Sequence, residues 1–336
     1  MSDPSHTRDL RSLLDRVWYE GAPAPWWLAA LVPVYRALRF LDQMPWRVGW
    51  RTPRRVGVPV VVVGNVAVGG SGKTPLVIAL VDALRARGWK PGVASRGYGG
   101  TRRRPLLLDD MPDPSGVGDE PTLIRHRTRA PVAVGRNRSH AAALLVEHGC
   151  DVILADDGLQ NPSLARDVEI CVIDGRRRFG NGRLLPAGPL REPVTRLATV
   201  DFRVCNGGSA QPGEIPMRLA GEMAVSLARD AATRPLESFA GTRVHAVAAI
   251  GHPERFFTSL RAHGIEVIAH AFPDHHRFEP ADLAFGDALP VLMTEKDAVK
   301  CTAWAAPGHW CVPVRAELPD SFPDAIDTRL RGLKGC

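Results

Sequence analysis

The chain has 336 residues, of which 45% are apolar, with 43 Lys and Arg against 36 Asp and Glu and six Cys. This length accommodates one large or two ordinary globular domains. The composition excludes a disulfide-stabilised miniprotein, a disordered acidic chain and a collagen-like fibre. The net charge of +7 is unevenly distributed, because residues 1–55 hold nine Arg and five acidic residues.

The first 55 residues also hold five of the eight Trp, and Trp interleaved with Arg is typical of a segment with one apolar and one wet side. Apolar residues at helical spacing predict an amphipathic helix over residues 10–18. A second apolar run, residues 26–41, is shorter than the roughly 20 residues needed to cross a bilayer. It fits a helix lying in a membrane interface and, equally well, a helix packed on the protein's own core.

Other features of the composition limit the partners and the compartment. The remaining positive charge is scattered and nearly balanced, which disfavours nucleic acid as a partner. The cysteines lack C-x-x-C pairing and mostly lie in apolar runs, which indicates buried free thiols rather than a zinc site. The polar N-terminus lacks the pattern of a signal peptide. We therefore expect a protein in the cytosol or attached to a membrane from the cytosolic side, with no obligate protein partner.

From residue 56 onward, short β-branched runs alternate with helical stretches, which predicts an α/β fold with a doubly wound parallel sheet. A buried strand is expected over 58–65 and a helix over 75–88. The segment NGGSAQPGEIP, residues 206–216, is the best linker candidate, and a second, smaller βα series follows it. The expected layout is a segment of amphipathic or interfacial helices, an N-terminal α/β domain, a linker and a C-terminal α/β domain, at residues 1–55, 56–208, 209–230 and 231–336.

The strongest motif is VVVVGNVAVGGSGKTP, which satisfies the relaxed P-loop pattern between an expected strand and an expected helix. In such a loop the backbone amides surround phosphate oxygens, while Lys73 reaches the β and γ phosphates and Thr74 supplies an oxygen to Mg²⁺. Only five of the 43 basic residues are Lys, so a Lys at this position is less easily attributed to background. The sequence predicts a nucleotide-binding loop formed by Ala67, Val68, Gly69, Gly70, Ser71, Gly72, Lys73 and Thr74, with Ala67 where the strict pattern has Gly.

A second motif is DVILADDGLQN, an apolar strand that ends in Asp156 and Asp157. This is typical of a Walker B strand, which presents carboxylate to Mg²⁺ directly or through water. Acidic pairs at strand ends also form simple turns. Because a P-loop precedes it, we favour the Mg²⁺ interpretation.

Two further segments carry polar residues in unusual settings. In GVGDEP, Asp119 precedes an expected helix and could serve only as its N-cap. The segment RFGNGRLLPAGPLREP, residues 178–193, is too rich in Gly and Pro to be an ordinary connection. It carries Arg191 and Glu192.

The C-terminal part contains two candidate motifs. In FPDHHRF, we favour an acid/base or hydrogen-bonding role for His275 over a metal site, because no third ligand stands at helical spacing. In LMTEKDAVK, Lys296 and Asp297 weakly resemble the base-reading pair of guanine-binding proteins. A helix cap followed by an i, i+4 Lys pair explains them equally well.

Taken together and in order, these motifs resemble the tetraacyldisaccharide 4′-kinase family of lipid A biosynthesis over nearly the whole chain. The residue His252 departs from the family pattern, which usually has Asn there, and this affects only a local contact. The motifs that carry the resemblance are GNVAVGGSGKTP, SRGYGG (95–100), VGDEP (117–121), DDGLQ (156–160), FGNGRLLPAGPLREP, PERFF (253–257), FPDHHRF and LMTEKDAVK.

The resemblance implies an ATP-dependent phosphotransferase with an alcohol group as acceptor, in which residues 56–208 form a P-loop kinase domain with a P-loop NTPase-like, doubly wound parallel sheet. The γ-phosphoryl group of ATP would pass to the 4′-hydroxyl of tetraacyldisaccharide 1-phosphate, a lipid-linked disaccharide, and give the bis-phosphorylated lipid A precursor lipid IVA. It also implies Mg²⁺ and peripheral or monotopic attachment to the cytosolic face of the inner membrane of a Gram-negative bacterium. The N-terminal segment would then serve for anchoring and substrate access.

The resemblance also implies roles for individual residues. Asp119 matches the family's proposed catalytic base, His275 the partner that tunes it, and Lys73 and Arg191 the catalytic cations. The implied metal set is Thr74, Asp156, Asp157 and Glu192. Since Asp119 and His275 lie on opposite sides of the expected linker, we hypothesise that the active site lies between two domains whose closure assembles the pair.

Two other classes of function remain open at this stage. One is a P-loop switch or maturation protein whose nucleotide hydrolysis drives partner binding or metal insertion. The other is a membrane-bound, ATP-dependent scaffold without a substrate of its own. Both predict hydrolysis of ATP to free phosphate without a labelled lipid product.

Overall fold

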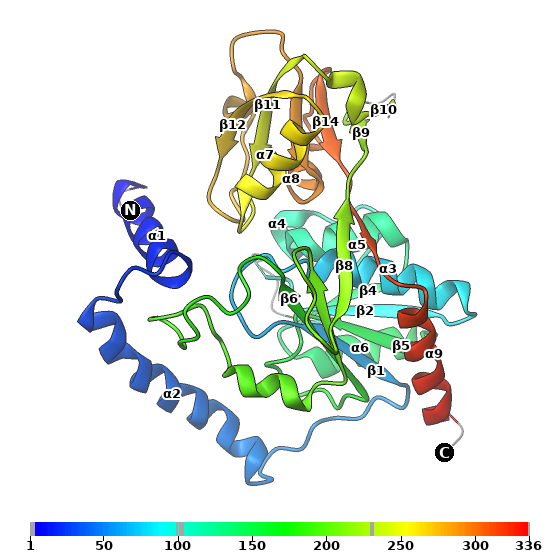
Figure 1. Cartoon of the computed structure of the whole chain (residues 1–336). Helices are drawn as coiled ribbons and strands as arrows, with labels where there is room; N and C mark the ends of the chain where they lie inside the picture. The colour runs from blue at the N-terminus through cyan, green and yellow to red at the C-terminus, as the bar shows by residue number, and fades with distance from the viewer. Residues whose placement is uncertain (1–3, 99, 101–103, 229–231, 335–336) are drawn as a thin grey trace.

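A larger and a smaller β-sheet organise the computed structural model, which describes residues 4–98, 100, 104–228 and 232–334 (Figure 1). Gly99 of the SRGYGG segment, residues 229 and 230 of the expected linker and Cys336 lie outside the described residues. The described cysteines, Cys150, Cys171, Cys205, Cys301 and Cys311, are buried and free.

The larger sheet is parallel from β4 to β8, and the short strands at its two edges, β3 and β15, pair antiparallel. Its strands, in order across the sheet, are β15 (Arg315–Glu317), β8 (Ile215–Ala220), β7 (Phe202–Asn206), β6 (Val168–Asp174), β1 (Val60–Gly64), β5 (Val152–Asp156), β2 (Pro91–Ser95), β4 (Val132–Val134) and β3 (Leu106–Leu107).

Helices cover both faces of this sheet. Along β1, Val61 and Val63 pack into one core and Val60 and Val62 into the other, because successive side chains of a strand point to opposite faces. The first core also holds residues of α3 (Lys73–Ala86), α5 (Asp119–Thr128) and α9 (Ser321–Lys334), and the second holds residues of α6 (Arg138–Glu147). The short helices α4 (Pro114–Val117) and η1 (Val194–Thr199) lie in connections. The predicted doubly wound sheet is confirmed.

The smaller sheet forms a second α/β unit, as predicted, with α7 (Pro253–Ala262) and α8 (Glu295–Cys301). The strands β14, β13, β11 and β12 are parallel to one another, and β9 and β10 add antiparallel pairs at the opposite edge from β12. In order, the strands are β10 (Thr233–Pro235), β9 (Met223–Ser226), β14 (His309–Val312), β13 (Val291–Thr294), β11 (Arg243–Ala248) and β12 (Glu266–Ala271), with the short helices η2 (Leu236–Phe239) and η3 (Pro280–Leu283) between strands.

The chain passes between the two sheets twice. The segment expected to be a linker contains β8 of the larger sheet and β9 of the smaller one, so the connection between the units is short. After β14 the chain returns, β15 pairs with β8, and α9 packs beside α3. The smaller unit is therefore built from residues 223–312, and the C-terminal segment belongs to the body of the larger sheet.

The N-terminal segment forms α1 (Pro4–Tyr19) and α2 (Trp26–Arg47), which extend to one side of the two sheets (Figure 1). Trp18 of α1 donates its indole hydrogen to the carbonyl oxygen of Pro186 at 2.9 Å. In α2, Leu28 is the one residue that is buried. Within the described ranges, no helix is long and apolar enough to cross a membrane.

Candidate active site

The P-loop turns between the end of β1 and the start of α3, and the structure places all of residues 67–74 in this turn or in the first helical residues. Gly72 has a φ of 94°, in the left-handed region that favours glycine. The Asn206 side chain donates to the Ser71 carbonyl oxygen at 2.9 Å, and a Cβ on Gly72 would lie 2.3 Å from the Asn206 amide nitrogen. This position therefore requires glycine.

The loop is held from two sides. Asn65 donates its side-chain amide to the Ser71 hydroxyl oxygen at 3.2 Å, and the Val68 amide donates to the Pro189 carbonyl oxygen at 2.8 Å. A pocket beside the loop is lined by residues of the loop itself and by Tyr19, Asn65, Val66, Val172, Ile173, Asp174, Arg177, Arg178, Phe179 and His252. These contacts fix the backbone amides around the space where phosphates bind in P-loop proteins.

Two cations face Asp157 at the end of β5. Lys73 Nζ lies 3.5 Å from Asp157 Oδ1, and Arg191 Nη1 lies 3.1 and 3.0 Å from the two carboxylate oxygens. Burial alone would raise the pKa of Asp157, but the charges of Lys73 and Arg191 outweigh it and lower the pKa to about 2. Asp157 is therefore ionised at neutral pH and holds both cations beside the loop.

The neighbouring Asp156 has the opposite electrostatic setting. Strand β5 pairs with β1 so that Asp156 lies beside Val63, one residue before the P-loop strand ends. Burial, followed by the charge of Asp157, raises the pKa of Asp156 to about 7. Its Oδ1 atom is buried and has no hydrogen-bond partner within the described part of the chain. A buried, unpaired carboxylate oxygen at this edge fits a bound cation.

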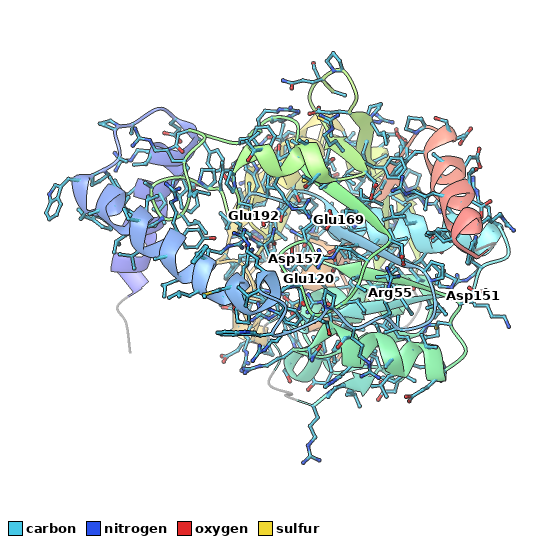
Figure 2. All side chains as sticks on the ribbon, turned by 90° about the horizontal axis from the view of Figure 1, so that it is seen from below. Arg55, Glu120, Asp151, Asp157, Glu169 and Glu192 are labelled. Atoms are coloured by element: carbon cyan, nitrogen blue, oxygen red, sulfur yellow. The ribbon has the colours of Figure 1, made fainter. Side chains whose placement is uncertain are left out.

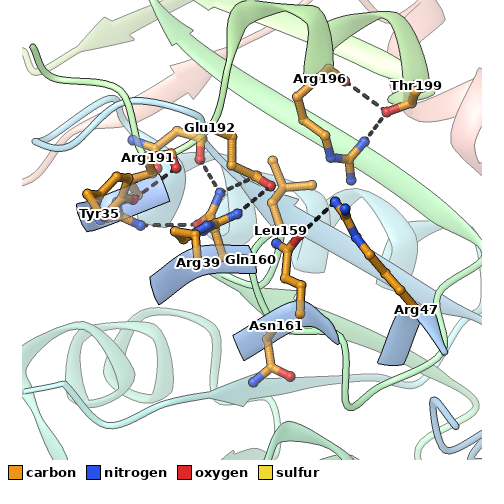
Figure 3. A network of polar contacts seen from close by, with 12 residues as sticks. Tyr35, Arg39, Arg47, Leu159, Gln160, Asn161, Arg191, Glu192, Arg196 and Thr199 are labelled. Carbon is orange, nitrogen blue, oxygen red and sulfur yellow. Dashed lines mark hydrogen bonds and ion pairs between the residues drawn. The ribbon is translucent and has the colours of Figure 1, made fainter. Parts of the chain in front are cut away.

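The segment that carries Arg191 and Glu192 lies beside Gln160, which follows shortly after the end of β5 (Figure 3). The Arg191 amide donates to the Val66 carbonyl oxygen at 2.7 Å, which ties this segment to the P-loop. Glu192 is 8% exposed, and its two carboxylate oxygens accept hydrogen bonds from Arg39 and Gln160, each at 2.8 Å. Direct ligation of a metal by Glu192 would have to displace one of these donors.

Asp119 and His275 meet where the smaller unit faces the larger one. Asp119 is the first residue of α5, and His275 lies in the connection after β12. His275 Nδ1 lies 3.1 Å from Asp119 Oδ2, and Lys300 Nζ lies 3.7 Å from the same oxygen. Burial alone would raise the pKa of Asp119, but the hydrogen bond from His275 and the charge of Lys300 outweigh it and lower the pKa. The same hydrogen bond raises the pKa of His275.

Helix α8 contributes a second cation to this cluster. Lys296 Nζ lies 2.7 Å from Glu120 Oε1 and 3.3 Å from Asp274 Oδ1. The charge of Glu120 also contributes to the raised pKa of Asp156, so the cluster extends to the end of β5. Figure 2 shows the labelled Glu120, Asp157 and Glu192 in the same region of the molecule.

A further loop of the smaller unit approaches the P-loop. A Cβ built on Gly251 would lie 3.0 Å from the Gly70 amide nitrogen. The P-loop, the end of β5 and the Asp119–His275 pair are thus gathered where the two units meet.

Comparison with known proteins matches residues 24–331 to the family model described as tetraacyldisaccharide-1-P 4′-kinase. The chain is 53% identical to the tetraacyldisaccharide 4′-kinase of Stenotrophomonas maltophilia, over 94% of this chain and 96% of that protein. It is 49% identical to the protein of the same name from Xylella fastidiosa, over 97% and 98% of the two chains.

The chain belongs to the tetraacyldisaccharide-1-P 4′-kinase family. It is therefore a kinase, as the resemblance implied. A solved structure described as the apo form of LpxK from Aquifex aeolicus in complex with ATP is similar over 90% of this chain and 99% of that chain, with a TM-score of 0.74 and 25% sequence identity. This similarity supports the two-unit α/β architecture described above.

The candidate motifs of this family member occupy different places in the structure. Most of them gather near the carboxyl ends of the parallel strands of the larger sheet, where His275 joins them from the smaller unit. These residues are Ala67 to Thr74, Asp119, Asp156, Asp157 and Arg191. Asp297 is 0% exposed and accepts hydrogen bonds from the Ala249 amide and from the hydroxyl of Thr294, the N-cap residue of α8. It is not available to bind a base.

Several polar residues in the site were not selected from the sequence. Lys300 and Gln160 contact selected residues directly, and Arg138 donates to the carbonyl oxygens of Asp156 and Asp157 at 3.0 and 3.3 Å. One signal could have identified Lys300, because lysine is rare in this Arg-rich chain. His252 lines the pocket beside the P-loop, and burial lowers its pKa.

Proposed function

We propose that the protein binds ATP with Mg²⁺ and transfers the γ-phosphoryl group to the 4′-hydroxyl of a tetraacyldisaccharide 1-phosphate, which gives the bis-phosphorylated lipid A precursor. The observation that carries the proposal is the Asp119–His275 contact, which joins the two units beside a P-loop. The names of the relatives and the ATP in the Aquifex aeolicus structure support the same substrates.

The proton acceptor would be Asp119. A sugar hydroxyl is a poor nucleophile at neutral pH, so a nearby carboxylate accelerates transfer by accepting its proton. The lowered pKa keeps Asp119 ionised. Because Oδ2 faces His275 and Lys300, we assign Oδ1 to the acceptor hydroxyl.

Positive charge would stabilise the transferred group. The phosphoryl transition state spreads negative charge over its oxygens, so positioned cations supply most of the catalysis. Lys73 and Arg191 are held beside the P-loop by Asp157. When ATP binds, their side chains would exchange this carboxylate for phosphate oxygens.

The residues at the end of β5 fit a magnesium site. Mg²⁺ in P-loop proteins is held by one or two oxygen ligands of the protein together with the nucleotide phosphates. Thr74 and Asp156 would hold the ion, because Asp156 offers a buried oxygen that lacks a partner among the described residues. Asp157 would complete the set. Bound Mg²⁺ supplies charge neutralisation for the phosphates.

The apolar face of α2 supports attachment to a lipid surface. An acceptor whose acyl chains stay in the bilayer requires an enzyme at the membrane surface. Exposed apolar residues on one helix mark such interaction sites, and those of α2 include Trp26, Leu31, Val34, Leu38, Phe40 and Leu41. We propose peripheral or monotopic attachment to the cytosolic face of the inner membrane, where the Arg excess of residues 1–55 meets anionic groups.

To test this proposal, purified protein is incubated with the lipid acceptor and with ATP that carries a radioactive γ-phosphate, and the labelled products are identified. We expect the label in a detergent-extractable glycolipid, and Lys73→Ala should abolish this product because the loop loses its phosphate-binding cation. The matched control is Lys90→Ala, since Lys90 is exposed and lies directly before β2. Label released only as free phosphate would instead indicate the switch or scaffold alternatives and overturn the proposal.

A further inference from the structure

Helix α2 presents different chemistry on two of its sides. Tyr35 and Arg39 stand one helical turn apart and contact the segment that carries Arg191 and Glu192 (Figure 3). The exposed side chains Leu31, Val34, Leu38 and Leu41 belong to the same helical stretch. A helix with a single buried residue, Leu28, has little apolar packing to locate it. Its polar contacts therefore contribute much of what fixes its position.

The contact from Arg39 continues to the P-loop. Arg39 Nη2 donates to Glu192 Oε1 at 2.8 Å, and Glu192 Oε2 accepts from Gln160 Nε2 at 2.8 Å. Gln160 Oε1 in turn accepts from Arg191 Nη1 at 3.4 Å. Arg191 then contacts Asp157, which lies 3.5 Å from Lys73 Nζ. Consecutive polar contacts thus join α2 to the cation of the P-loop.

A second contact acts on the backbone of the same segment. The Tyr35 hydroxyl donates to the Arg191 carbonyl oxygen at 2.9 Å. Glu192 is 8% exposed, and it forms an ion pair with Arg39. Removing the partner of a buried charge is strongly unfavourable, so without Arg39 the Glu192 side chain would move or recruit another cation. Arg191 is one such cation, because Gln160 already links it to Glu192.

We propose that Tyr35 and Arg39 are positioning residues that hold Arg191 and Glu192 for phosphoryl transfer, so that α2 is part of the active-site frame as well as a lipid-facing helix. This inference rests on the proposed function. It explains why a helix with an exposed apolar face also carries a cation that is directed into the protein. Seating of α2 on a lipid surface would then stabilise the arrangement of the catalytic cations.

The test compares Arg39→Met with Arg36→Met, which removes the same charge from an exposed position of the same helix. With a detergent-dispersed acceptor, we expect Arg39→Met to lower kcat on the order of 10- to 100-fold with little change in the KM for lipid. Arg36→Met should retain the kcat of the unmodified protein. Both variants should float equally with anionic phospholipid vesicles, because each loses one positive charge.

Two conservative variants separate positioning from folding. Arg39→Lys keeps the charge and should recover part of kcat, and Tyr35→Phe removes only the hydroxyl donor and should lower kcat several-fold. If Arg39→Met fails to fold, the kcat values of Arg39→Lys and Tyr35→Phe test the positioning role instead. In a Glu192→Gln background, Arg39→Met should cause little further loss, because Arg39 acts through Glu192.

Equal kcat values for Arg39→Met and Arg36→Met would overturn the inference, as would full additivity of the Arg39 and Glu192 variants. Loss of kcat that tracks loss of vesicle binding would also overturn it, since that result assigns Arg39 to anchoring alone. The proposed function fails separately, if the unmodified protein gives no labelled lipid.

Discussion

Asp119 and His275 are 156 positions apart in the chain, yet Asp119 Oδ2 and His275 Nδ1 lie 3.1 Å apart. One residue begins a helix of the larger unit, and the other follows a strand of the smaller unit. The contact therefore depends on the placement of the two units. Movement that separates them would leave Asp119 without its hydrogen-bond donor.

Replacing Asp119 with Asn tests its role as proton acceptor. Asn keeps the size of the side chain but cannot take up the hydroxyl proton, so kcat should fall by roughly 10² to 10⁴. Binding of a fluorescent ATP analogue should stay close to normal, because the P-loop is unchanged. Asp110→Asn is the control, since the Asp110 side chain is 79% exposed. Turnover within a factor of two of the control would remove Asp119 from this role.

The His275 contact predicts a pH dependence of stability. The hydrogen bond to Asp119 raises the pKa of His275 in the folded protein above its value of 6.5 in the unfolded chain. Its stabilisation is therefore complete below about pH 6.5 and is lost as the pH rises through the folded pKa. The Tm of the unmodified protein should exceed the Tm of His275→Gln by more at about pH 6 than at about pH 9. An equal difference at both pH values would show that the pair does not titrate in this way.

The sequence predicted the parallel sheet and the P-loop because both depend on local pattern. A buried run such as Val60–Gly64 and a Gly-rich turn before Lys73 are visible without any tertiary information. The contacts of Arg39 and Lys300 could not be predicted. These contacts depend on how a whole helix packs against another segment. A single Arg or Lys in a helical sequence does not indicate which residue it will contact.

Opposite effects on stability are expected for the two aspartates at the end of β5. Burial raises the pKa of Asp156 from 3.8 to about 7. Without a bound cation, ionised Asp156 therefore destabilises the folded protein. This destabilisation grows between pH 3.8 and about pH 7 and is complete above about pH 7. Asp156→Asn should therefore raise the Tm at about pH 8 in the presence of a chelator. Asp157 has a pKa of about 2 and pairs with Lys73 and Arg191, so Asp157→Asn should lower the Tm.

Differential scanning calorimetry without nucleotide measures both variants. Each replaces a carboxylate with an amide at adjacent positions, so each is the matched control of the other. A lower Tm for Asp156→Asn at about pH 8 would mean that its carboxylate has a stabilising partner. That result would remove the unpaired oxygen on which the magnesium site is proposed.

The exposed face of α2 predicts binding to lipid vesicles. Leu31 and Leu38 are 45% and 62% exposed, so Leu31→Glu with Leu38→Glu should leave the fold intact. The added charges should abolish flotation with anionic vesicles, because the apolar area is lost and the lipid surface repels them. Met111→Glu, at a residue 77% exposed in another part of the chain, is the control and should still float. Unchanged flotation of the double variant would place lipid binding elsewhere.

The boundaries between the units were less accessible to sequence reasoning. Strand β8 has mixed exposure along its length, and β15 is only Arg315–Glu317, so neither shows a strong strand pattern. The pairing of β8 with β15 is a long-range contact, because the whole smaller unit lies between these two strands in the chain. Short edge strands of this kind are specified by their partners rather than by their own sequence.

The most direct measurement is the ratio of phosphorylated glycolipid formed to ATP consumed, with ³¹P spectroscopy of the lipid product. We predict a ratio close to one and a new phosphate monoester at the 4′ position, with both lost in Lys73→Ala. ATP consumed at the same rate with and without the acceptor, with free phosphate as the product, would contradict phosphoryl transfer to lipid at the site between the two units.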